Sequence, residues 1–473
     1  MFTQRVLVVI KKIIPGPIFK FFQPYYHYTM SYVAAFWYRF PSEKLIVIGV
    51  TGTTGKTTSV YLMAEMFREC GLKVGYTSTA MFSNGDRDWL NDKKMTMLGR
   101  FFTQKMLSQM VKNGCRYVII ETTSEGIVQF RHRFIDYDVL VFTGLYSEHL
   151  ESHGGFENYK QAKGLLFAHL EKCKVKHIDD QKNVLTGLSK NEKSEAKRVE
   201  KIIIANGDDD YCDYFLRFWA EKKYKIKSKK FEVKSGEDKL LENKIEEISI
   251  NKLKVNKLGM QFELYPIYDF ELYMLGEFNV MNVSFGIVAA YTQNLKMVKI
   301  KNYLKKIRGV PGRLEQLDFG QNFKIIVDYA FEPVALHKLF DIVNAKLRGG
   351  RVIHVLGSAG GGRDVARRPE LGKISAQNAD IVIVTNEDPY DEDPLKIMID
   401  VAVGAKKGGK KEDKDLYIIE DRRKAIFKAL SLAKKNDVVL VTGKGSEQAI
   451  CVKNGETIPW DDRKVVKVEY EKL

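Results

Sequence analysis

Ten residues, Gly49–Thr58, have the types and the spacing needed to hold a phosphate group. They read GVTGTTGKTT and lie between a predicted strand and a predicted helix. Glycines let the backbone curl so that several N–H groups point at phosphate oxygens, and the start of the helix adds a positive field. Lys56 supplies a charge for the β- and γ-phosphates, and Thr57 supplies a hydroxyl for Mg²⁺. The loop therefore predicts an enzyme that uses ATP.

The glycine spacing of this loop differs from the general phosphate-loop pattern. That pattern, G-x-x-x-x-G-K-[ST], would require glycine at position 50, where this chain has Val50. The glycines fall instead at Gly49, Gly52 and Gly55. A match of this kind between a strand and a helix is rarely accidental, so we predict nucleotide binding rather than a purely structural turn.

A carboxylate follows a second predicted strand. Tyr117–Ile120 is apolar, and Glu121 comes directly after it. In an open α/β sheet the carboxyl ends of the strands face the ligand crevice. Carboxylate oxygens at that place suit a hard cation such as Mg²⁺. A structural acid is the alternative interpretation of Glu121.

The elements that must position these residues alternate between strands and helices. We predict a strand over Leu45–Val50, a helix over Thr57–Cys70, and buried strands over Tyr117–Ile120 and Val139–Phe142. This alternation predicts a parallel α/β sheet. Asp210–Phe270 carries short alternating strands and predicts a small antiparallel addition to the same domain.

A second α/β series begins after about Ile300, and its strands are predicted over Lys324–Val327, Arg351–Leu356, Ile381–Thr385 and Val438–Thr442. We therefore expect an α/β protein of three parts. Residues 1–43 form a short aromatic and basic arm. Residues 44–300 form a central parallel-sheet phosphate-loop ATPase domain, and residues 301–473 form a Rossmann-like C-terminal domain.

The composition and net charge limit the classes of function that the chain can have. The chain has 473 residues, 45% of them hydrophobic, and a net charge of +16. This charge favours an anionic ligand, an anionic membrane surface or nucleic acid, or it reflects only a lysine-rich surface. The lysines are dispersed and no nucleic-acid-binding module is recognisable, so we expect no nucleic acid partner. Five scattered cysteines without a CxxC pair argue against a disulfide framework or a zinc site and fit the cytoplasm.

The arm at residues 1–43 mixes aromatic and basic side chains. Its apolar run Val6–Ile10 is too short to span a membrane, and no small-residue cleavage site follows. Tyr28–Phe40 is rich in aromatics and carries Arg39 near its end. Two interpretations remain open: a helical arm packed on the body, which we prefer, or peripheral contact with the inner face of the membrane.

Several segments together resemble the Mur ligase family, which also includes folylpolyglutamate synthases. The loop at Gly49–Thr58 is similar to the family's G-x-T-G-T-x-G-K-T-T. Residues 142–167, FTGLYSEHLESHGGFENYKQAKGLLF, are similar to F-T-N-L-x-x-D-H-L-D-x-H-G-x-x-x-x-Y-x-x-A-K-x-x-L-F. GEFNVMN (276–282), VPGRLEQ (310–316) and VDYAFEP (327–333) resemble G-x-F-N-x-x-N, V-P-G-R-x-E and D-Y-A-H-x-P. The resemblance covers residues 44 to 462.

This resemblance implies a ligase that uses ATP and Mg²⁺ to join an amine to a carboxylate through an acyl phosphate. The implied catalytic residues are Lys56, Lys163 and Arg313. The implied metal ligands are Thr57, Glu121, His149 and Lys163, of which Lys163 matches the lysine that becomes carbamylated. The implied nucleotide contacts are Gly52, Thr53, Thr54, Gly55, Lys56, Thr57, Thr58, Asn279, Asn282, Arg313 and Asp328.

Three later segments resemble the branch of the family that adds the third amino acid of the peptidoglycan stem. They are GGGRDVARRPELG (360–372), TNEDPYDEDP (385–394) and VTGKGSEQ (441–448). The implied substrate contacts are Thr123, Ser124, Arg363, Glu387, Asp388, Tyr390 and Glu447.

Two departures from this branch bear on the substrates. Tyr390 replaces the arginine that clasps the distal carboxylate of meso-diaminopimelate, and Glu387 and Asp388 form an acidic pair beside it. The hypothesis is therefore a lysine-like amino acid. The branch begins with a uridine-binding domain, whereas here 43 residues without an α/β pattern precede the first strand. We expect a small-molecule or lipid-linked peptide acceptor and a free amino acid.

Other function classes are weaker. A folylpolyglutamate- or cyanophycin-type ligase is disfavoured by Arg363, the Asp388–Pro389 pair and Glu447. A non-catalytic subunit is disfavoured by four intact residues, Lys56, Glu121, His149 and Lys163.

Overall fold

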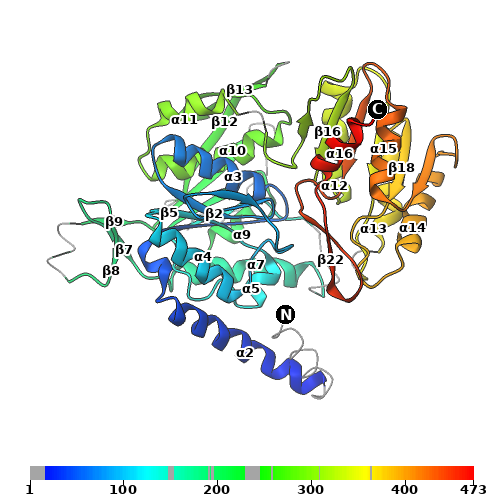
Figure 1. Cartoon of the computed structure of the whole chain (residues 1–473). Coiled ribbons are helices and arrows are strands. Elements are labelled where there is room, and N and C mark those ends of the chain that lie inside the picture. The colour runs from blue at the N-terminus through cyan, green and yellow to red at the C-terminus, as the bar shows by residue number, and fades with distance from the viewer. Residues whose placement is uncertain are drawn as a thin grey trace.

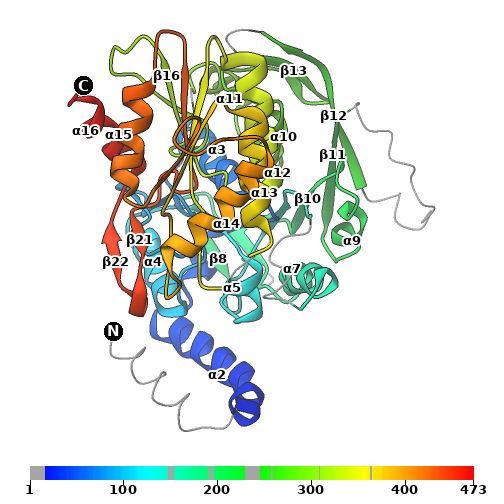
Figure 2. The ribbon, with the colours of Figure 1, turned by 90° about the vertical axis from the view of Figure 1, so that its right-hand side faces the viewer.

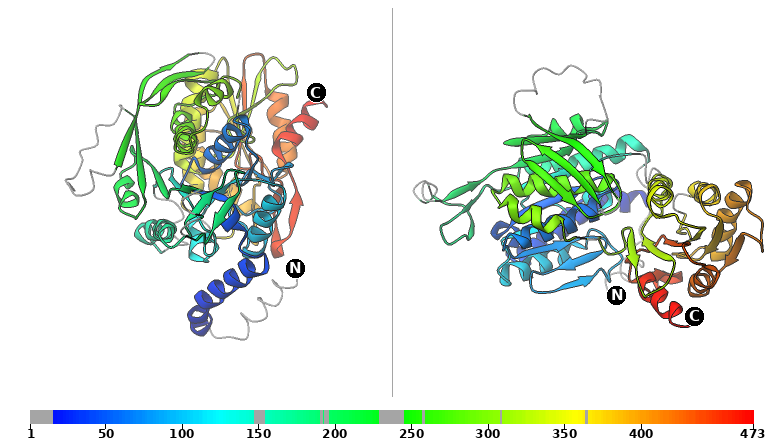
Figure 3. Two further views of the ribbon diagram at one scale, coloured as in Figure 1. Left: turned by 90° about the vertical axis from the view of Figure 1, so that its left-hand side faces the viewer. Right: turned by 90° about the horizontal axis from the view of Figure 1, so that it is seen from above.

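The computed structural model describes residues 16–146, 154–189, 192, 196–228, 245–256, 259–307, 309–362 and 365–473. Two α/β lobes stand side by side, and a long helix, α2 (Gly16–Trp37), runs along the outside of the first lobe (Figure 1). The view from above in Figure 3 shows the two lobes as separate sheets with their own helices.

The central lobe is built on an eleven-stranded sheet, and its middle positions the phosphate loop. β1 (Ile46–Thr51) lies between β5 (Tyr117–Glu121) and β6 (Val139–Phe142), and all three are parallel. Every residue of these strands is buried, as expected for parallel strands covered on both faces. The register pairs Val50 with Glu121, so the end of β5 lies beside the loop that follows β1.

The rest of the sheet extends to both sides of this centre. The full order is β14-β13-β12-β11-β10-β6-β1-β5-β2-β3-β4. The flanking strands are β2 (Val74–Thr77), β3 (Met81–Ser83), β4 (Asp88–Leu90), β10 (Ile202–Asn206), β11 (Lys222–Ser228), β12 (Ile245–Val255), β13 (Met260–Tyr265) and β14 (Tyr268–Leu272). A separate three-stranded sheet contains β7 (Lys176–Ile178), β8 (Val184–Thr186) and β9 (Lys197–Val199).

The antiparallel addition expected over Asp210–Phe270 is smaller than predicted. β11 pairs in parallel with both β10 and β12, and only β12, β13 and β14 are antiparallel to one another. The short helix α9 (Cys212–Leu216) carries the chain back after β10, so β11 enters the sheet in the parallel direction.

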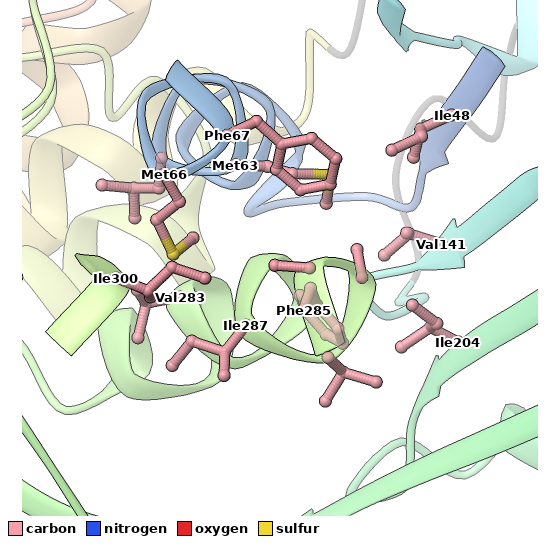
Figure 4. Packing of buried hydrophobic residues seen from close by; sticks show 14 of the residues in the cluster. Ile48, Met63, Met66, Phe67, Val141, Ile204, Val283, Phe285, Ile287 and Ile300 are labelled. Atoms are coloured by element: carbon pink, nitrogen blue, oxygen red, sulfur yellow. The ribbon is translucent and has the colours of Figure 1, made fainter. Parts of the chain in front are cut away.

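Helices cover both faces of the central sheet. α3 (Lys56–Glu69), α10 (Phe278–Thr292) and α11 (Met297–Leu304) lie on one face, and α4 (Arg100–Lys112) and α7 (Phe156–Leu170) lie on the other. Figure 4 shows Met63, Met66 and Phe67 of α3 interdigitating with Val283 and Ile287 of α10. A Cβ on Gly286 would lie 2.2 Å from the Met66 side chain, so this glycine permits close contact of the two helices.

The chain passes from the first lobe to the second after α11. Met297, Ile300 and Leu304 of this helix are buried in the core of the central lobe. The helix α11 therefore extends beyond residue 300, the boundary predicted from the sequence.

The C-terminal lobe contains a six-stranded sheet in the order β15-β16-β20-β17-β18-β19, with only β15 antiparallel. Its strands are β15 (Glu315–Leu317), β16 (Lys324–Asp328), β17 (Val352–Leu356), β18 (Ile381–Thr385), β19 (Leu416–Ile419) and β20 (Val438–Thr442). One face is covered by α12 (Pro333–Ile342), α13 (Arg367–Asn378) and α14 (Pro394–Lys407), and the other by α15 (Arg422–Leu432) and α16 (Asp462–Tyr470) (Figure 2). The hairpin of β21 (Ala449–Cys451) and β22 (Thr457–Pro459) follows β20. The predicted Rossmann-like α/β arrangement is confirmed.

The helix α2 packs on the central lobe through one side. The Ser31 hydroxyl donates to the Phe130 carbonyl at 2.9 Å, and the Arg100 guanidinium donates to the His27 carbonyl at 3.2 Å. Within the described ranges, no helix combines the length and apolarity needed to cross a bilayer.

Candidate active site

The phosphate loop follows β1 and ends in the first turn of α3. Its backbone takes left-handed conformations at Gly55, with φ of +80°, and at Gly52, with φ of +153°. A Cβ on Gly52 would lie 2.0 Å from the Thr143 hydroxyl, and one on Gly55 would lie 2.4 Å from Asn282 Oδ1. Glycine is therefore required at both positions by conformation and by space. The first N–H groups of α3 are left free to face an anion.

Gly49 has a different role from the other glycines of the loop. It lies within β1, and a Cβ there would come within 2.8 Å of the Leu140 and Tyr137 side chains. Glycine is therefore required at position 49 by the packing of the central sheet, and Gly49 is not part of the turn that faces the phosphate.

Residues that directly follow β6, and one residue of α7, donate and accept hydrogen bonds that fix the backbone of the loop. The Thr143 hydroxyl donates to the Thr54 carbonyl at 2.6 Å, and the Thr53 N–H donates to the Gly144 carbonyl at 2.7 Å. The ammonium of Lys163, which is 2% exposed, donates to the Gly52 carbonyl at 2.9 Å. Lys163 thus lies against the loop and not on a solvated helix face.

Lys56 and Thr57 stand at the start of α3. The Lys56 ammonium donates to the Thr53 carbonyl at 2.7 Å, so the side chain folds over the loop. The Thr57 hydroxyl donates to Glu121 Oε2 at 2.9 Å. Thr58 is buried behind them.

Glu121 lies at the end of β5 and is 1% exposed. Besides Thr57, its carboxylate accepts the Thr79 N–H at 2.8 Å and the Thr79 hydroxyl at 3.0 Å. The Thr57 and Glu121 oxygens together form a pair of hard donors at the edge of the loop, and these suit Mg²⁺. Among the described residues no group of three His, Cys, Asp or Glu side chains forms a metal cluster. His149 lies outside the described residues.

Asn279 and Asn282 lie in the first turns of α10, beside the phosphate loop. Asn282 Nδ2 donates to Asn279 Oδ1 at 3.0 Å, and Asn279 Nδ2 donates to the Leu275 carbonyl at 2.7 Å. Asn282 Oδ1 faces Gly55, so the Asn282 side chain lies between the phosphate loop and the backbone of α10.

The second lobe contributes Arg313 to the same place. Arg313 Nη2 lies 3.4 Å from the Thr57 hydroxyl, and the guanidinium carbon lies 4.2 Å from the centre of the Tyr329 ring. Asp328, at the end of β16, accepts the N–H groups of Leu314 and Ala330 at 2.6 and 2.7 Å. Because the Asp328 carboxylate accepts both of these N–H groups, it shapes the turn that carries Arg313. Burial raises the pKa of Asp328.

A second cluster, which we call the ammonium cluster, consists of Lys94, Asp388, Lys444 and Glu447. Lys444 donates to Asp388 at 2.8 Å and to Glu447 at 2.7 Å. Lys94 comes from the central lobe and donates to the same two carboxylates at 2.9 and 2.5 Å. Burial opposes ionisation of both acids, but Lys444 and Lys94 hold the pKa of each below its ordinary value. Two acids and two bases make the cluster electrically neutral.

The adjacent acids Glu387 and Asp388 do not face the same group. Asp388 belongs to the ammonium cluster, whereas Glu387 is 4% exposed and its Oε2 has no hydrogen-bond partner. Burial and the neighbouring Asp388 raise the pKa of Glu387 to about 7. The acid that joins Asp388 in facing an ammonium group is therefore Glu447, since Glu387 lies under Gly443.

The remaining predicted substrate residues are placed as follows. The Thr123 hydroxyl accepts the Gly126 N–H at 3.2 Å and caps α5 (Ser124–Val128), and Ser124 is buried. Tyr390 has a φ of +53° and donates its N–H to the Cys451 carbonyl at 3.2 Å. Arg363 lies outside the described residues.

Several residues at the site were not singled out from the sequence. Lys444 and Tyr329 lie inside quoted motifs, and the i,i+3 spacing of Lys444 and Glu447 was a usable signal. Lys94 and Thr79 belong to no motif, because their position depends on how the loops meet in space.

Comparisons with known proteins agree with this architecture. Residues 50–201 match the Mur ligase middle domain, and residues 312–445 match the Mur ligase glutamate ligase domain. The UDP-N-acetylmuramyl-tripeptide synthetase of Treponema denticola is 34% identical over 439 residues, which cover 92% of this chain and 78% of that protein.

Two further relatives extend the comparison. The UDP-N-acetylmuramoyl-L-alanyl-D-glutamate–2,6-diaminopimelate ligase of Geobacillus thermodenitrificans is 31% identical over 446 residues, covering 93% of this chain and 81% of that one. A solved structure of a UDP-N-acetylmuramoyl-L-alanyl-D-glutamate–2,6-diaminopimelate ligase aligns with a TM-score of 0.54 and 25% identity, over 91% of this chain and 79% of that chain.

Proposed function

The chain belongs to the Mur ligase family and is an ATP-dependent ligase that forms carbon–nitrogen bonds, and from this premise we propose that it adds an amino acid to a muramyl-peptide carboxylate in peptidoglycan precursor synthesis. One observation carries the proposal. Arg313 of the second lobe reaches Thr57 of the phosphate loop, while Lys94 of the first lobe reaches Asp388 and Glu447. The site between the lobes therefore has two parts, one suited to phosphate and one suited to an ammonium group.

The proposed reaction has two steps. The acceptor carboxylate attacks the γ-phosphorus of ATP, ADP leaves, and an acyl phosphate forms. The amine of the amino acid then attacks the acyl carbon, inorganic phosphate leaves, and the nitrogen loses a proton. Lys56 and Arg313 stabilise the charge that develops on the transferring phosphoryl group. Closure of the two lobes brings the acyl phosphate and the amine together.

We propose that Thr57, Glu121, His149 and Lys163 hold magnesium. The adjacent Thr57 and Glu121 oxygens support this assignment, as does the position of Lys163 against Gly52. When bound, the ion would neutralise phosphate charge. Carbamylation of Lys163 belongs to the same proposal, because a carbamate would add oxygen donors beside the loop. Asn279 and Asn282, by their place beside Gly55, are proposed to contact the nucleotide.

The acceptor in this proposal is a muramyl peptide, either a small molecule or lipid-linked. The reaction takes place in the cytoplasm, and residues 1–43 contact the inner face of the membrane. The distribution of aromatic and basic residues in this arm supports that location.

Product analysis tests the activity. The full chain is incubated with ATP, a UDP-muramyl dipeptide and a mixture of amino acids, and the products are identified by mass spectrometry. We expect ADP, phosphate and an acceptor heavier by one amino-acid residue. Phosphate release without a new amide product, with every acceptor offered, would contradict the proposal.

The added amino acid is proposed to carry an amine on its side chain. Tyr390 offers no positive charge for a second carboxylate, and Asp388 and Glu447 face an ammonium group. We expect a kcat/KM for lysine at least about tenfold above that for meso-diaminopimelate. Phosphate release over an amino-acid panel measures this ratio, and a clear preference for meso-diaminopimelate would overturn the assignment.

Lys94 occupies the place where such an ammonium group would bind. Lys444 is fully buried and belongs to the same lobe as Asp388 and Glu447, so it stays with them. Lys94 arrives from the loop after β4, and its backbone has a φ of +52°, a conformation that lysine rarely adopts. Once Lys94 withdraws, the cluster has one negative charge without a partner. A substrate ammonium restores the balance.

A Lys94→Met variant tests this competition. We expect the KM for the amino acid to fall about three- to tenfold, because the site no longer has to expel an internal ammonium. Steady-state kinetics at saturating ATP measure it. Lys93→Met is the matched control, since Lys93 pairs with Asp92 at the surface and should leave the KM unchanged. A higher KM in Lys94→Met would show instead that Lys94 holds the lobes in the active arrangement.

A further inference from the structure

One half of α2 presents large apolar side chains to solvent. These are Phe21, Phe22, Tyr25, Tyr26, Tyr28, Tyr32, Val33, Phe36 and Trp37. At about 100° per residue they occupy about half of the helix circumference. Trp37 is 73% exposed and Phe36 is 64% exposed. Apolar surface of this extent on one helix usually marks an interaction site. We call these nine residues the aromatic face.

The opposite half of α2 packs on the protein, since Ser31, Ala34 and Ala35 are buried against the central lobe. Two members of the aromatic face, Tyr28 and Tyr32, also pack edge-on against Phe134, at 5.2 and 5.3 Å between ring centroids. These contacts hold the helix against the lobe and direct the aromatic face outward. Figure 1 and the left view of Figure 3 show α2 below the central lobe, joined to it at the C-terminal end of the helix and projecting from it toward the N-terminal end.

The charge of the N-terminal sequence indicates the partner of the aromatic face. Residues 1–42 contain five basic residues and no aspartate or glutamate. The basic residues are Arg5, Lys11, Lys12, Lys20 and Arg39, of which Arg5, Lys11 and Lys12 lie outside the described residues. The aromatic face itself carries no charged side chain. Tyrosine and tryptophan rings favour the headgroup level of a bilayer, and lysine and arginine next to them attract anionic lipids. A second copy of the chain would instead bring two basic segments together, which like-charge repulsion disfavours.

We propose that the aromatic face of α2 docks onto an anionic membrane surface, with the helix parallel to the plane of the bilayer. The helix has 22 residues, enough to cross a membrane, but it is not apolar enough to do so, and we therefore place it in the interface. This inference specifies the proposed membrane location and does not depend on the ligase assignment.

Sedimentation of the full chain with vesicles tests the docking. We expect binding to phosphatidylcholine vesicles that contain phosphatidylglycerol, weaker binding at high salt, and little binding to phosphatidylcholine alone. A variant with Phe22→Ser, Phe36→Ser and Trp37→Ser should bind at least about tenfold more weakly, because its apolar contact area is lost. The matched control is Tyr265→Ser with Tyr268→Ser, since these tyrosines are 61% and 55% exposed on the β13–β14 hairpin. This control should bind like the wild type.

Trp37 provides a second readout. Its fluorescence emission should move to shorter wavelength when anionic vesicles are added, and Trp37→Phe should lose that shift while it still binds. Three results would overturn the proposal: no binding of the wild type to anionic vesicles, equal loss in the control variant, or a dimer in sedimentation velocity that only the triple variant dissolves.

Ligase turnover with a soluble acceptor separates this inference from the proposed function. We expect the triple variant to retain wild-type turnover. Lack of turnover in the wild type would contradict the ligase assignment and leave the vesicle result unaffected.

Discussion

Replacing Lys56 by alanine is expected to lower ATP-dependent turnover by about a thousandfold. The Lys56 ammonium folds over the phosphate loop and has the Thr53 carbonyl as its partner at 2.7 Å. It is therefore free to exchange that carbonyl for phosphate oxygens when ATP binds. Its charge stabilises the transition state most strongly, because negative charge builds up there on the transferring phosphoryl group. The loss in kcat should therefore be larger than the loss in affinity for ATP.

The folded state should tolerate this substitution. Lys56 is only partly buried at the first position of α3, and alanine favours a helix. Phosphate release measures turnover, and circular dichroism with a thermal melt checks the fold. Lys112→Ala, at the exposed end of α4, is the matched control and should retain full turnover. Full turnover in Lys56→Ala would refute the assignment of the loop.

The phosphate loop was predictable from the sequence because its requirements are local. Gly52 and Gly55 are needed for positive φ and for close contact with Thr143 and Asn282, and Lys56 and Thr57 follow at fixed spacing. A glycine at position 49 looked like part of the same pattern, but its reason is the packing of Tyr137. Local spacing alone does not separate these two causes.

The amine-binding half was predictable only in part. The motifs pointed to Asp388 and Glu447, and both lie in the ammonium cluster. Lys94 could not be predicted, because it arrives from the other lobe and its position depends on how the lobes meet. Glu387 was expected to share the task of Asp388. Neighbouring residues just beyond a strand point in different directions, and Glu387 points into the protein.

The parallel extension of the central sheet shows a similar limit. Alternating short strands after residue 210 suggested antiparallel pairing, but strand direction depends on the connection that precedes each strand. The short helix α9 returns the chain after β10, and so β11 pairs in parallel. Hydrophobic alternation reports which face of a strand is buried and carries no information on strand direction.

Glu121→Gln is the second substitution with a large expected effect, a loss of about a hundredfold or more in turnover. The two side chains have the same size, so the change removes a charge and replaces an acceptor oxygen by an NH₂ donor. In the folded protein the carboxylate accepts from the Thr57 hydroxyl and from Thr79. An amide can still accept with its remaining oxygen, but it offers a metal ion no negative charge.

The magnesium dependence distinguishes a metal ligand from a structural acid. If Glu121 holds magnesium, the Mg²⁺ concentration for half-maximal turnover should rise in Glu121→Gln, and added Mg²⁺ should restore part of the loss. If Glu121 only orders the loop through Thr57 and Thr79, turnover should fall without any change in that concentration, and the melting temperature should fall with it. Glu65→Gln on α3 is the matched control, because Glu65 pairs with Arg68 away from the loop and should change neither quantity. An unchanged Mg²⁺ dependence in Glu121→Gln would therefore remove this residue from the metal site while leaving the nucleotide assignment of Lys56 standing.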